Sequence, residues 1–299
     1  MLRKGMYVEA VECTDLEFSR RRFLLDSDAV LQAIMASSAE YVLVNYKKSK
    51  GEFSPPASLA GKSQPSNSSR KSGERSRIQN TVSQATTILR DGFDDIKHGK
   101  FSIGSFAPAA NHVDVSLKAS PDLLIEVTRL QTKDEGTYVH SLAVSGLMTG
   151  LGHLLDLSAE MVKELTIAGL LHDLGKLLIP NAILNKNGQL TNEERLVVRS
   201  HPERGYALLK QHPEVSDVIL DVCRFHHEVL DGSGYPVGLR GDQLSLPVRI
   251  CTVCDVFDAL TSARPYKSEW STTDALKWMF ERGHLFDRNL ILRLGSMLD

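Results

Sequence analysis

The sequence predicts a mainly α-helical protein, in which an all-α domain over residues 120–299 follows a small mixed α/β domain within residues 1–115. Three observations predict this organisation. Beyond residue 120, apolar residues recur at helical spacing and strand-like alternation is nearly absent. Before residue 49, short strand-like runs flank one helical segment. Between the two domains, residues 49–76 hold nine Ser, three Pro and three Gly, a composition typical of a flexible loop or linker.

The N-terminal domain is predicted to contain two strands, a short helix between them and one longer helix. Residues 5–11 and 41–46 are the strand-like runs, and residues 28–37 form a helix that begins at an aspartate, a favourable N-cap. A further helix is predicted over residues 78–96, broken near Gly92, because glycine weakens a helix interior.

Capping signals mark several helix starts in the C-terminal domain. Ser158 precedes an apolar stripe, Thr191 and Glu194 have the spacing of a capping box, and Pro202 suits a first helical position. The predicted helices are residues 123–130, residues 137–155, residues 158–172, one starting at Thr191, one starting at His201, residues 214–227, residues 246–262 and residues 272–282.

The overall composition is that of a soluble globular protein. The chain has 299 residues, a formal net charge of −2, 42% apolar and 24% charged residues. No apolar run approaches the ~18 residues that cross a bilayer, so no membrane span is expected, and no apolar run typical of a signal peptide follows the N-terminal residues. Four cysteines do not indicate a disulfide scaffold, and Cys251 and Cys254 are expected to be small buried residues. A cytoplasmic location is therefore expected.

The charge differs between the two ends of the chain. Residues 1–120 contain 17 Lys and Arg against 13 Asp and Glu, whereas the remaining residues contain 18 against 24. An acidic domain lacks the broad basic surface that duplex nucleic acid requires, so DNA is not an expected partner. A phosphate-bearing ligand would need metal ions or a few well-placed cations.

Histidines and aspartates recur at points of the helical domain where apolar residues would be ordinary. A single histidine on a helix is usually a structural residue, but the combination favours a metal site. Their positions are His140, His172, Asp173, His201, His226, His227 and Asp255.

The pair His172 and Asp173 is the most informative of these positions. His172 continues the apolar stripe of its predicted helix, and a carboxylate buried directly after it costs several kcal/mol unless it is paired or bound to a metal. Imidazole and carboxylate donors suit Fe, Mn, Zn or Ni, and a shared carboxylate suits a centre of two metals.

The most specific pattern runs from the histidine pair through a glycine-rich turn, His226-His227-Glu228-Val229-Leu230-Asp231-Gly232-Ser233-Gly234-Tyr235-Pro236. It resembles the signature of HD-GYP domains, a branch of the HD metal-dependent phosphohydrolases that degrade the bacterial second messenger cyclic di-GMP. The resemblance covers about residues 120–295 and implies an HD-type helical bundle. Three further motifs carry it, namely Leu171-His172-Asp173-Leu174-Gly175-Lys176, His201-Pro202-Glu203-Arg204-Gly205 and the run from Asp255 through Arg264 to Tyr266.

The resemblance implies two divalent metal ions per chain, with Fe or Mn favoured over Ni or Zn. The first ion would be held by His140, His172, Asp173 and Asp255. The second would be held by Asp173, His201, His226 and His227, so that Asp173 bridges the two.

The resemblance also implies residues for catalysis and substrate binding. Asp173 and Lys176 would be catalytic, with Lys176 beside the scissile phosphate. Tyr235, Arg264 and Lys267 match positions that contact the nucleotide, although a solvated surface is the ordinary role of an isolated Arg or Lys.

Some members of the family bind a third metal through a glutamate four residues before the first histidine. That position is Gly136 here, and Glu135 is displaced by one residue, a rotation of ~100° on a helix. Two metals are therefore expected.

Three functions remain open at this stage. The first is hydrolysis of cyclic di-GMP to pGpG, and on to GMP, by a hydroxide that two metals activate. The second is hydrolysis of another cyclic dinucleotide such as cyclic GMP-AMP. The third is a non-catalytic sensor of cyclic di-GMP that binds diguanylate cyclase (GGDEF) domains through the Gly-Tyr-Pro loop, and such binding is also open for the enzyme. The N-terminal domain resembles a small domain of unknown function that often precedes HD-GYP domains, and a homodimer is open.

Overall fold

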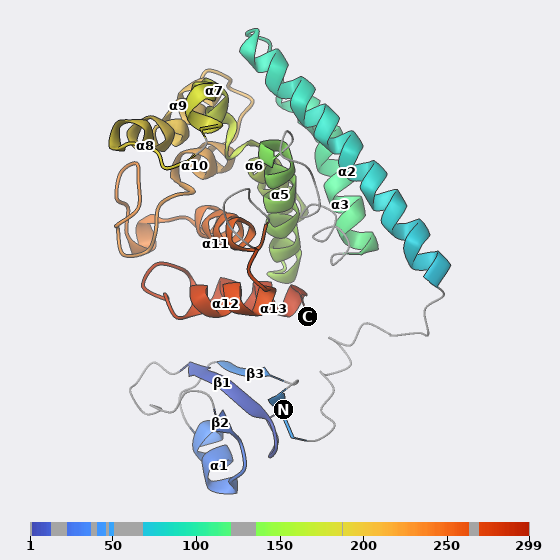
Figure 1. Cartoon of the computed structure of the whole chain (residues 1–299), viewed down its shortest axis with the longest axis vertical. Helices are drawn as coiled ribbons and strands as arrows, with labels where there is room; N and C mark the ends of the chain where they lie inside the picture. Colours follow the sequence, from blue (N-terminus) through green and yellow to red (C-terminus); the bar gives the residue numbers. More distant parts are fainter. Residues whose placement is uncertain are drawn as a thin grey trace. The chain divides into compact units, whose positions relative to one another are not determined.

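The computed structural model describes residues 2–12, 23–36, 41–45, 48–50, 68–120, 136–186, 188–262 and 269–298. They belong to two compact units, residues 1–67 and residues 68–299, each with its own core (Figure 1). Mainly α-helical architecture with a small α/β unit at the N-terminus confirms the predicted fold class.

The first unit is a three-stranded antiparallel sheet with one helix. The strand order is β2-β1-β3, and Val8, Leu25 and Ile34 form the small core. The structure confirms the two predicted strands and the predicted helix and adds the short β2. The elements are β1 (Tyr7–Glu12), β2 (Phe23–Leu24), α1 (Asp28–Ala36) and β3 (Tyr41–Asn45).

The second unit begins with the long helix α2 (Ser68–Lys97), which packs against α3 (Ala107–Ala119) and α5 (Gly136–Leu154). Two expectations are wrong here. Residues 68–76 are helical rather than linker, because a helix anchored by a packed apolar stripe adds one hydrogen bond for each further residue. The helix is also unbroken at Gly92, where a Cβ would lie 2.7 Å from the ring of Phe106, so the glycine permits close packing.

Besides α2 and α3, the helices α6, α11 and α13 pack against α5 (Figure 1). α10 packs on α6, and α12 packs on α11 and α13. Their bounds are α6 (Ala159–Leu171), η4 (Leu174–Leu178), α7 (Asn181–Leu184), α8 (Asn192–Arg199), α9 (His201–Leu209), α10 (Asp217–Phe225), η5 (Gly241–Gln243), α11 (Leu246–Thr261), α12 (Thr272–Phe280) and α13 (Arg288–Leu298), with η2 (Ile103–Phe106) preceding α3.

Local capping explains where several helices begin. The Ser158 side chain accepts a hydrogen bond from the Met161 amide at the start of α6, and Thr191 and Glu194 form a reciprocal capping box at the start of α8. Pro202 lies in the first turn of α9. These three predicted starts are confirmed.

Other predicted boundaries differ from the structure. The helix predicted over residues 214–227 is shorter, because Ser216 caps α10 and the chain turns after Phe225. The sequence reading missed α13. The helix predicted over residues 123–130 lies outside the described residues.

The division between the two units also differs from the predicted domain boundary near residues 115–120. The second unit starts at Ser68, because α2 and α3 pack on the helical core. Among the described residues, no helix has both the length and the apolar character needed to cross a membrane.

Candidate metal centre

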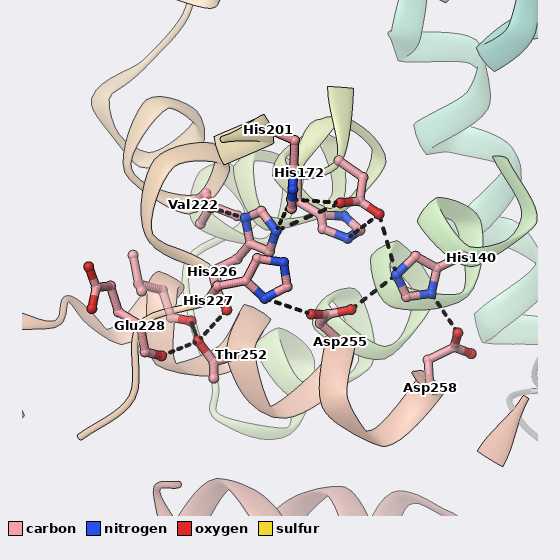
Figure 2. A network of polar contacts seen from close by, with 12 residues as sticks. His140, His172, His201, Val222, His226, His227, Glu228, Thr252, Asp255 and Asp258 are labelled. Carbon is pink, nitrogen blue, oxygen red and sulfur yellow. Dashed lines mark hydrogen bonds and ion pairs between the residues drawn. The ribbon is translucent and has the colours of Figure 1, made fainter. Parts of the chain in front are cut away.

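Six elements bring the predicted histidines and aspartates to one place (Figure 2). Each element contributes at its end or from one buried face. His140 comes from α5, His172 follows α6, Asp173 precedes η4, His201 starts α9, His226 and His227 follow α10, and Asp255 lies within α11.

Close packing of η4 against α9 brings Asp173 to His201. Gly175 makes that approach possible, because a Cβ at this position would overlap the carbonyl oxygen of His201. The Lys176 amide donates to the Asp173 carbonyl, which forms the tight turn at the start of η4. The short segment after α6 is therefore shaped to present one carboxylate to several histidines.

The Asp173 carboxylate lies at the middle of the cluster and is 1% exposed. Its Oδ1 is 3.2 Å from Nε2 of His201 and 3.7 Å from Nε2 of His226. Its Oδ2 is 3.5 Å from Nε2 of His172 and 3.7 Å from Nε2 of His140. The two oxygens thus face different pairs of histidines.

Asp255 lies on the other side of the cluster. Its Oδ1 is 3.0 Å from Nε2 of His140, and its Oδ2 is 3.7 Å from Nδ1 of His227. Figure 2 shows His140 between Asp255 and Asp258.

The ligand atoms fall into two groups, in each of which they lie within 4.8 Å of one another. We name them the Asp173 group and the His140 group. The Asp173 group consists of Asp173, His201, His226 and His227, and the His140 group consists of His140, His172 and Asp255. This division is the one that the sequence motifs predict, with Asp173 next to both groups.

Four imidazole rings are oriented by hydrogen bonds on Nδ1. The Nδ1–H of His172 donates to the Gly169 carbonyl at 2.8 Å, and that of His201 to the Val198 carbonyl at 2.8 Å. His226 makes the same kind of bond to the last turn of α10, and His140 donates to a carboxylate instead. In His172, His201 and His226 this bond leaves Nε2 with a lone pair that points into the cluster, the arrangement found for histidines that bind metals.

The donor set fits divalent cations. His172 Nε2 is buried and has no hydrogen-bond partner among the described residues. Nε2 of His201 and Nε2 of His226 lie 3.2 Å apart, although both are acceptors when their Nδ1 atoms are protonated. Two facing lone pairs in a buried site require a proton or a cation between them, and nitrogen and oxygen donors of this kind suit Fe, Mn, Ni or Zn.

Burial keeps most of these histidines neutral. Desolvation lowers the pKa of His172 and of His226, and it lowers the pKa of His227 to about 4. Burial also lowers the pKa of His140, but its hydrogen bonds to Asp255 and Asp258 outweigh this effect and raise the pKa to about 10.

The carboxylates remain ionised in spite of their burial. Desolvation raises the pKa of Asp173, but the charge of Lys176 and the surrounding histidines hold the pKa well below its ordinary value. In the same way, the hydrogen bond from His140 holds the pKa of Asp255 below its ordinary value. The neutral rings of His172, His226 and His227 beside two charged carboxylates are ready to bind cations.

Of the predicted substrate-binding residues, the structure places Lys176 and Tyr235 beside the cluster. Lys176 Nζ lies 2.5 Å from Oδ2 of Asp173, and its side chain is 27% exposed. The Tyr235 ring stacks on His227, with 4.7 Å between the centroids. Arg264 and Lys267 lie outside the described residues.

The sequence reading missed the residues that support the site. Asp258 accepts the hydrogen bond of His140 at 2.6 Å, and Thr252 donates to the carbonyls of His226 and Glu228. Asp258 follows Asp255 by three residues in an otherwise apolar helix, so helical spacing could have assigned it to the same face. Glu228 carries no such signal, because its partners come from a later loop.

Family models match both parts of the chain. The HD domain model matches residues 117–290, more than half of the chain, and a domain of unknown function, DUF3391, matches residues 1–101. The chain belongs to the HD domain family. The two matched ranges divide the chain close to the predicted boundary, whereas the packing divides it before α2.

Several curated proteins are similar to this chain. The chain is 37% identical over 298 residues to the cyclic di-GMP phosphodiesterase PA4108 of Pseudomonas aeruginosa, covering 96% of this chain and 72% of that protein. It is 43% identical to the cyclic di-GMP phosphodiesterase response regulator RpfG of Xanthomonas campestris and 41% identical to the 3'3'-cGAMP-specific phosphodiesterase 1 of Vibrio cholerae. These two matches cover 53% and 50% of this chain, and 42% and 35% of the relatives.

A solved structure has the same fold. It is Bd1817, an HDG"Y"P protein from Bdellovibrio bacteriovorus, with a TM-score of 0.62 at 15% identity, covering 100% of this chain and 95% of that chain. The family that the sequence motifs indicate and the HD-type helical fold are both confirmed.

Proposed function

We propose that this chain is a metal-dependent phosphodiesterase that hydrolyses cyclic di-GMP to pGpG. One observation carries the proposal: the buried carboxylate of Asp173 faces Nε2 atoms of both ligand groups, at 3.2 Å from His201 and 3.5 Å from His172. A carboxylate shared in this way is typical of centres with two metals. The named activities of PA4108 and RpfG favour cyclic di-GMP as the substrate.

In this proposal the His140 group would hold one divalent cation and the Asp173 group the other, and Asp173 would be a ligand of both. Fe or Mn is the favoured metal, and Ni or Zn also suits the donors. When bound, the two cations lower the pKa of a water molecule and neutralise negative charge on the phosphate.

Asp173 and Lys176 have the central roles among the chain's own residues. Asp173 would be a ligand of both cations, and its ion pair with Lys176 keeps that side chain in place. The partly exposed ammonium of Lys176 binds a non-bridging phosphate oxygen and stabilises the charge that develops there. Tyr235, Arg264 and Lys267 contact the nucleotide.

The proposed product is set by the number of metals. Gly136, four residues before His140, has no side chain that could bind a third cation. With two cations the cyclic substrate is opened, and further cleavage of pGpG to GMP is slower, so pGpG accumulates.

One other function has specific support. A 41% identical relative named as specific for 3'3'-cGAMP favours cyclic GMP-AMP as a second candidate substrate. We also propose the Gly-Tyr-Pro loop beside His227 as a contact for diguanylate cyclase (GGDEF) domains, and a homodimer as a further assembly of this chain. The small number of cysteines supports a cytoplasmic location for this activity.

The proposal is tested by metal analysis together with turnover of cyclic di-GMP, cyclic GMP-AMP and cyclic di-AMP by the same preparation. We expect two metals per chain, cyclic di-GMP consumed fastest, and pGpG as the accumulating product. The Asp173→Ala variant serves as the inactive control. Full metal content without turnover of any of the three substrates would instead favour a non-catalytic sensor.

A further inference from the structure

The loop that follows the histidine pair is held by a buried carboxylate. Glu228 is fully buried, and its side chain accepts hydrogen bonds from three successive backbone amides, those of Val237 at 2.7 Å, Gly238 at 2.9 Å and Leu239 at 3.1 Å. Charge-assisted bonds to three consecutive amides fix the backbone of this segment. Tyr235, two residues earlier, is therefore presented from a rigid loop.

The Tyr235 ring lies between two side chains. His227 stacks on it with 4.7 Å between centroids and an angle of 26° between the rings. The guanidinium carbon of Arg199 lies 4.3 Å from the centroid of the same ring. Each group fills the face of the Tyr235 ring that it covers, so His227 and Arg199 lie on opposite faces of that ring. The guanidinium carbon of Arg199 is therefore within about 9 Å of the centroid of the His227 ring.

This arrangement changes what Tyr235 can offer a ligand. With both faces of its ring covered, Tyr235 cannot stack on a nucleobase while Arg199 stays in place. The outer surface of the stack is the Arg199 guanidinium, which is exposed.

The side-chain donors of Arg199 differ from those of Arg204 and Arg224 in the same unit. Arg204 donates to the Leu178 carbonyl, and Arg224 donates to Glu203. No hydrogen bond or ion pair joins the Arg199 side chain to another residue in the part of the chain that the structure describes. The N–H donors of its planar guanidinium are therefore available to bind an anion, and their geometry suits a phosphate group.

We infer that Arg199 is a ligand-binding residue of this site, held by Tyr235 so that its guanidinium binds a phosphate of the nucleotide other than the scissile one. The inference rests on the proposed function, since a cyclic dinucleotide carries two phosphates. Lys176, paired with Asp173 at the metal groups, serves the scissile phosphate. Arg199 lies on the far side of Tyr235 from His227 and serves the second phosphate.

The test compares wild type with Arg199→Ala, Arg199→Lys and Arg195→Ala. Arg195 is exposed one turn earlier on α8, so its replacement removes the same charge from the same helix without touching the stack. For each protein, metal content, the Kd for cyclic di-GMP, and kcat and KM are measured for cyclic di-GMP and for bis(p-nitrophenyl) phosphate, a diester with one phosphate.

We expect Arg199→Ala to raise the Kd and KM for cyclic di-GMP about tenfold or more, the effect of losing a charge-assisted hydrogen bond. Metal content and the KM for the single-phosphate diester should stay unchanged. Arg199→Lys should recover part of the affinity for cyclic di-GMP, because an ammonium keeps the charge but cannot form paired hydrogen bonds or stack on an aromatic ring as a guanidinium does. Arg195→Ala should behave as wild type.

Other results overturn the inference. Unchanged Kd in Arg199→Ala means that the side chain is only solvated surface, and tighter binding means that it blocks the face of Tyr235. Equal losses for both substrates mean that it supports the metal groups. A wild-type protein that binds cyclic di-GMP without hydrolysing it overturns the proposed function while the Kd comparison still decides on Arg199, and a wild type that binds no cyclic dinucleotide overturns both.

Discussion

The carboxylate of Asp258 lies 2.6 Å from Nδ1 of His140, while Nε2 of the same ring lies 3.0 Å from Asp255. His140 therefore spans two carboxylates, and Asp258 is in turn held by the Ser262 hydroxyl, which donates to it at 3.0 Å. His172, His201 and His226 are oriented by backbone carbonyls instead. Within the His140 group, a carboxylate therefore supports His140, whereas a backbone carbonyl supports His172 as it does His201 and His226.

Asp258→Asn is expected to weaken metal binding at the His140 group alone. Loss of such a supporting carboxylate lowers metal affinity about 10- to 100-fold. Metal titration should show one strong and one weakened site per chain. Asp217→Asn, in the first turn of α10, is the matched control and should keep two strong sites. Two unchanged sites in Asp258→Asn would contradict a supporting role for this residue.

Asp173→Ala is expected to remove the ligand that both groups share. Metal content should fall from about two to below one per chain, and hydrolysis should become undetectable, whereas the helical circular dichroism should remain, because the apolar core does not depend on this side chain. Wild-type activity with full metal content would refute the bridging role.

Lys176→Met is expected to affect turnover more than metal binding. Removing one charged group that stabilises a transition state lowers kcat by about 10²- to 10³-fold, while the metal ligands remain in place. The comparison uses Lys163→Met, which replaces an exposed lysine of α6. If loss of metal accounts for the entire loss of activity, Lys176 acts on the metal groups and not on the phosphate.

The stability of the metal-free protein should depend on pH in a direction set by the buried histidines. The pKa values of His172, His226 and His227 are lowered, so below about pH 6.5 the unfolded chain binds protons that the folded chain does not. The free energy of unfolding should fall as the pH drops from 6.5 toward 4, by about 1.4 kcal/mol per pH unit for each such histidine.

His140 acts in the opposite sense at higher pH. Its pKa is raised to about 10, so its contribution is complete below about pH 6.5 and is lost as the pH rises toward 10. Urea unfolding of chelator-treated protein at several pH values measures the free energy of unfolding in both the acidic and the alkaline range. His227→Gln should reduce the acid slope, and His98→Gln, which replaces an exposed histidine directly after α2, should not. A flat profile between pH 6.5 and 4 would show that the histidines are not buried in neutral form.

Gly136→Glu tests the number of metals. Wild type should bind two Fe or Mn ions per chain at saturation, because position 136 lacks a side chain one turn before His140. The variant should bind a third ion and convert pGpG to GMP faster. Gly136→Gln has a similar size but no charge and should keep two. Three ions in wild type, or two in Gly136→Glu, would show that this position does not govern the metal count.

Much of the site could be predicted because its residues lie in short local motifs. His172 with Asp173, and His226 with His227, are adjacent in the chain at helix ends. The two residues of each pair therefore stay close together however the helices pack. The structure brings all seven predicted ligand residues together, and their binding of metals stays a prediction. The helix starts at Ser158 and Thr191 were predictable for the same reason, since a cap involves only neighbours within one turn.

The errors arose where packing overrides local preference. Gly92 reads as a helix break, but in α2 it gives room to the ring of Phe106. Residues 68–76 have the composition of a linker and are helical, because the helix extends from a buried stripe that begins at Ile78. Composition indicates which secondary structure a segment prefers in isolation, and it does not show how contacts with the rest of the fold change that preference.

By itself, the sequence determined the helical fold class, the family motifs and the positions of histidine and aspartate along the chain. Only the tertiary structure decided which atoms support them: Asp258 on His140 through the packing of α11 on α5, and Glu228 on the amides of Val237 to Leu239. It also decided that Arg199 covers Tyr235. The physical reason is that motif spacing constrains residues within a turn or two, whereas a hydrogen bond between distant segments depends on how whole helices and loops pack.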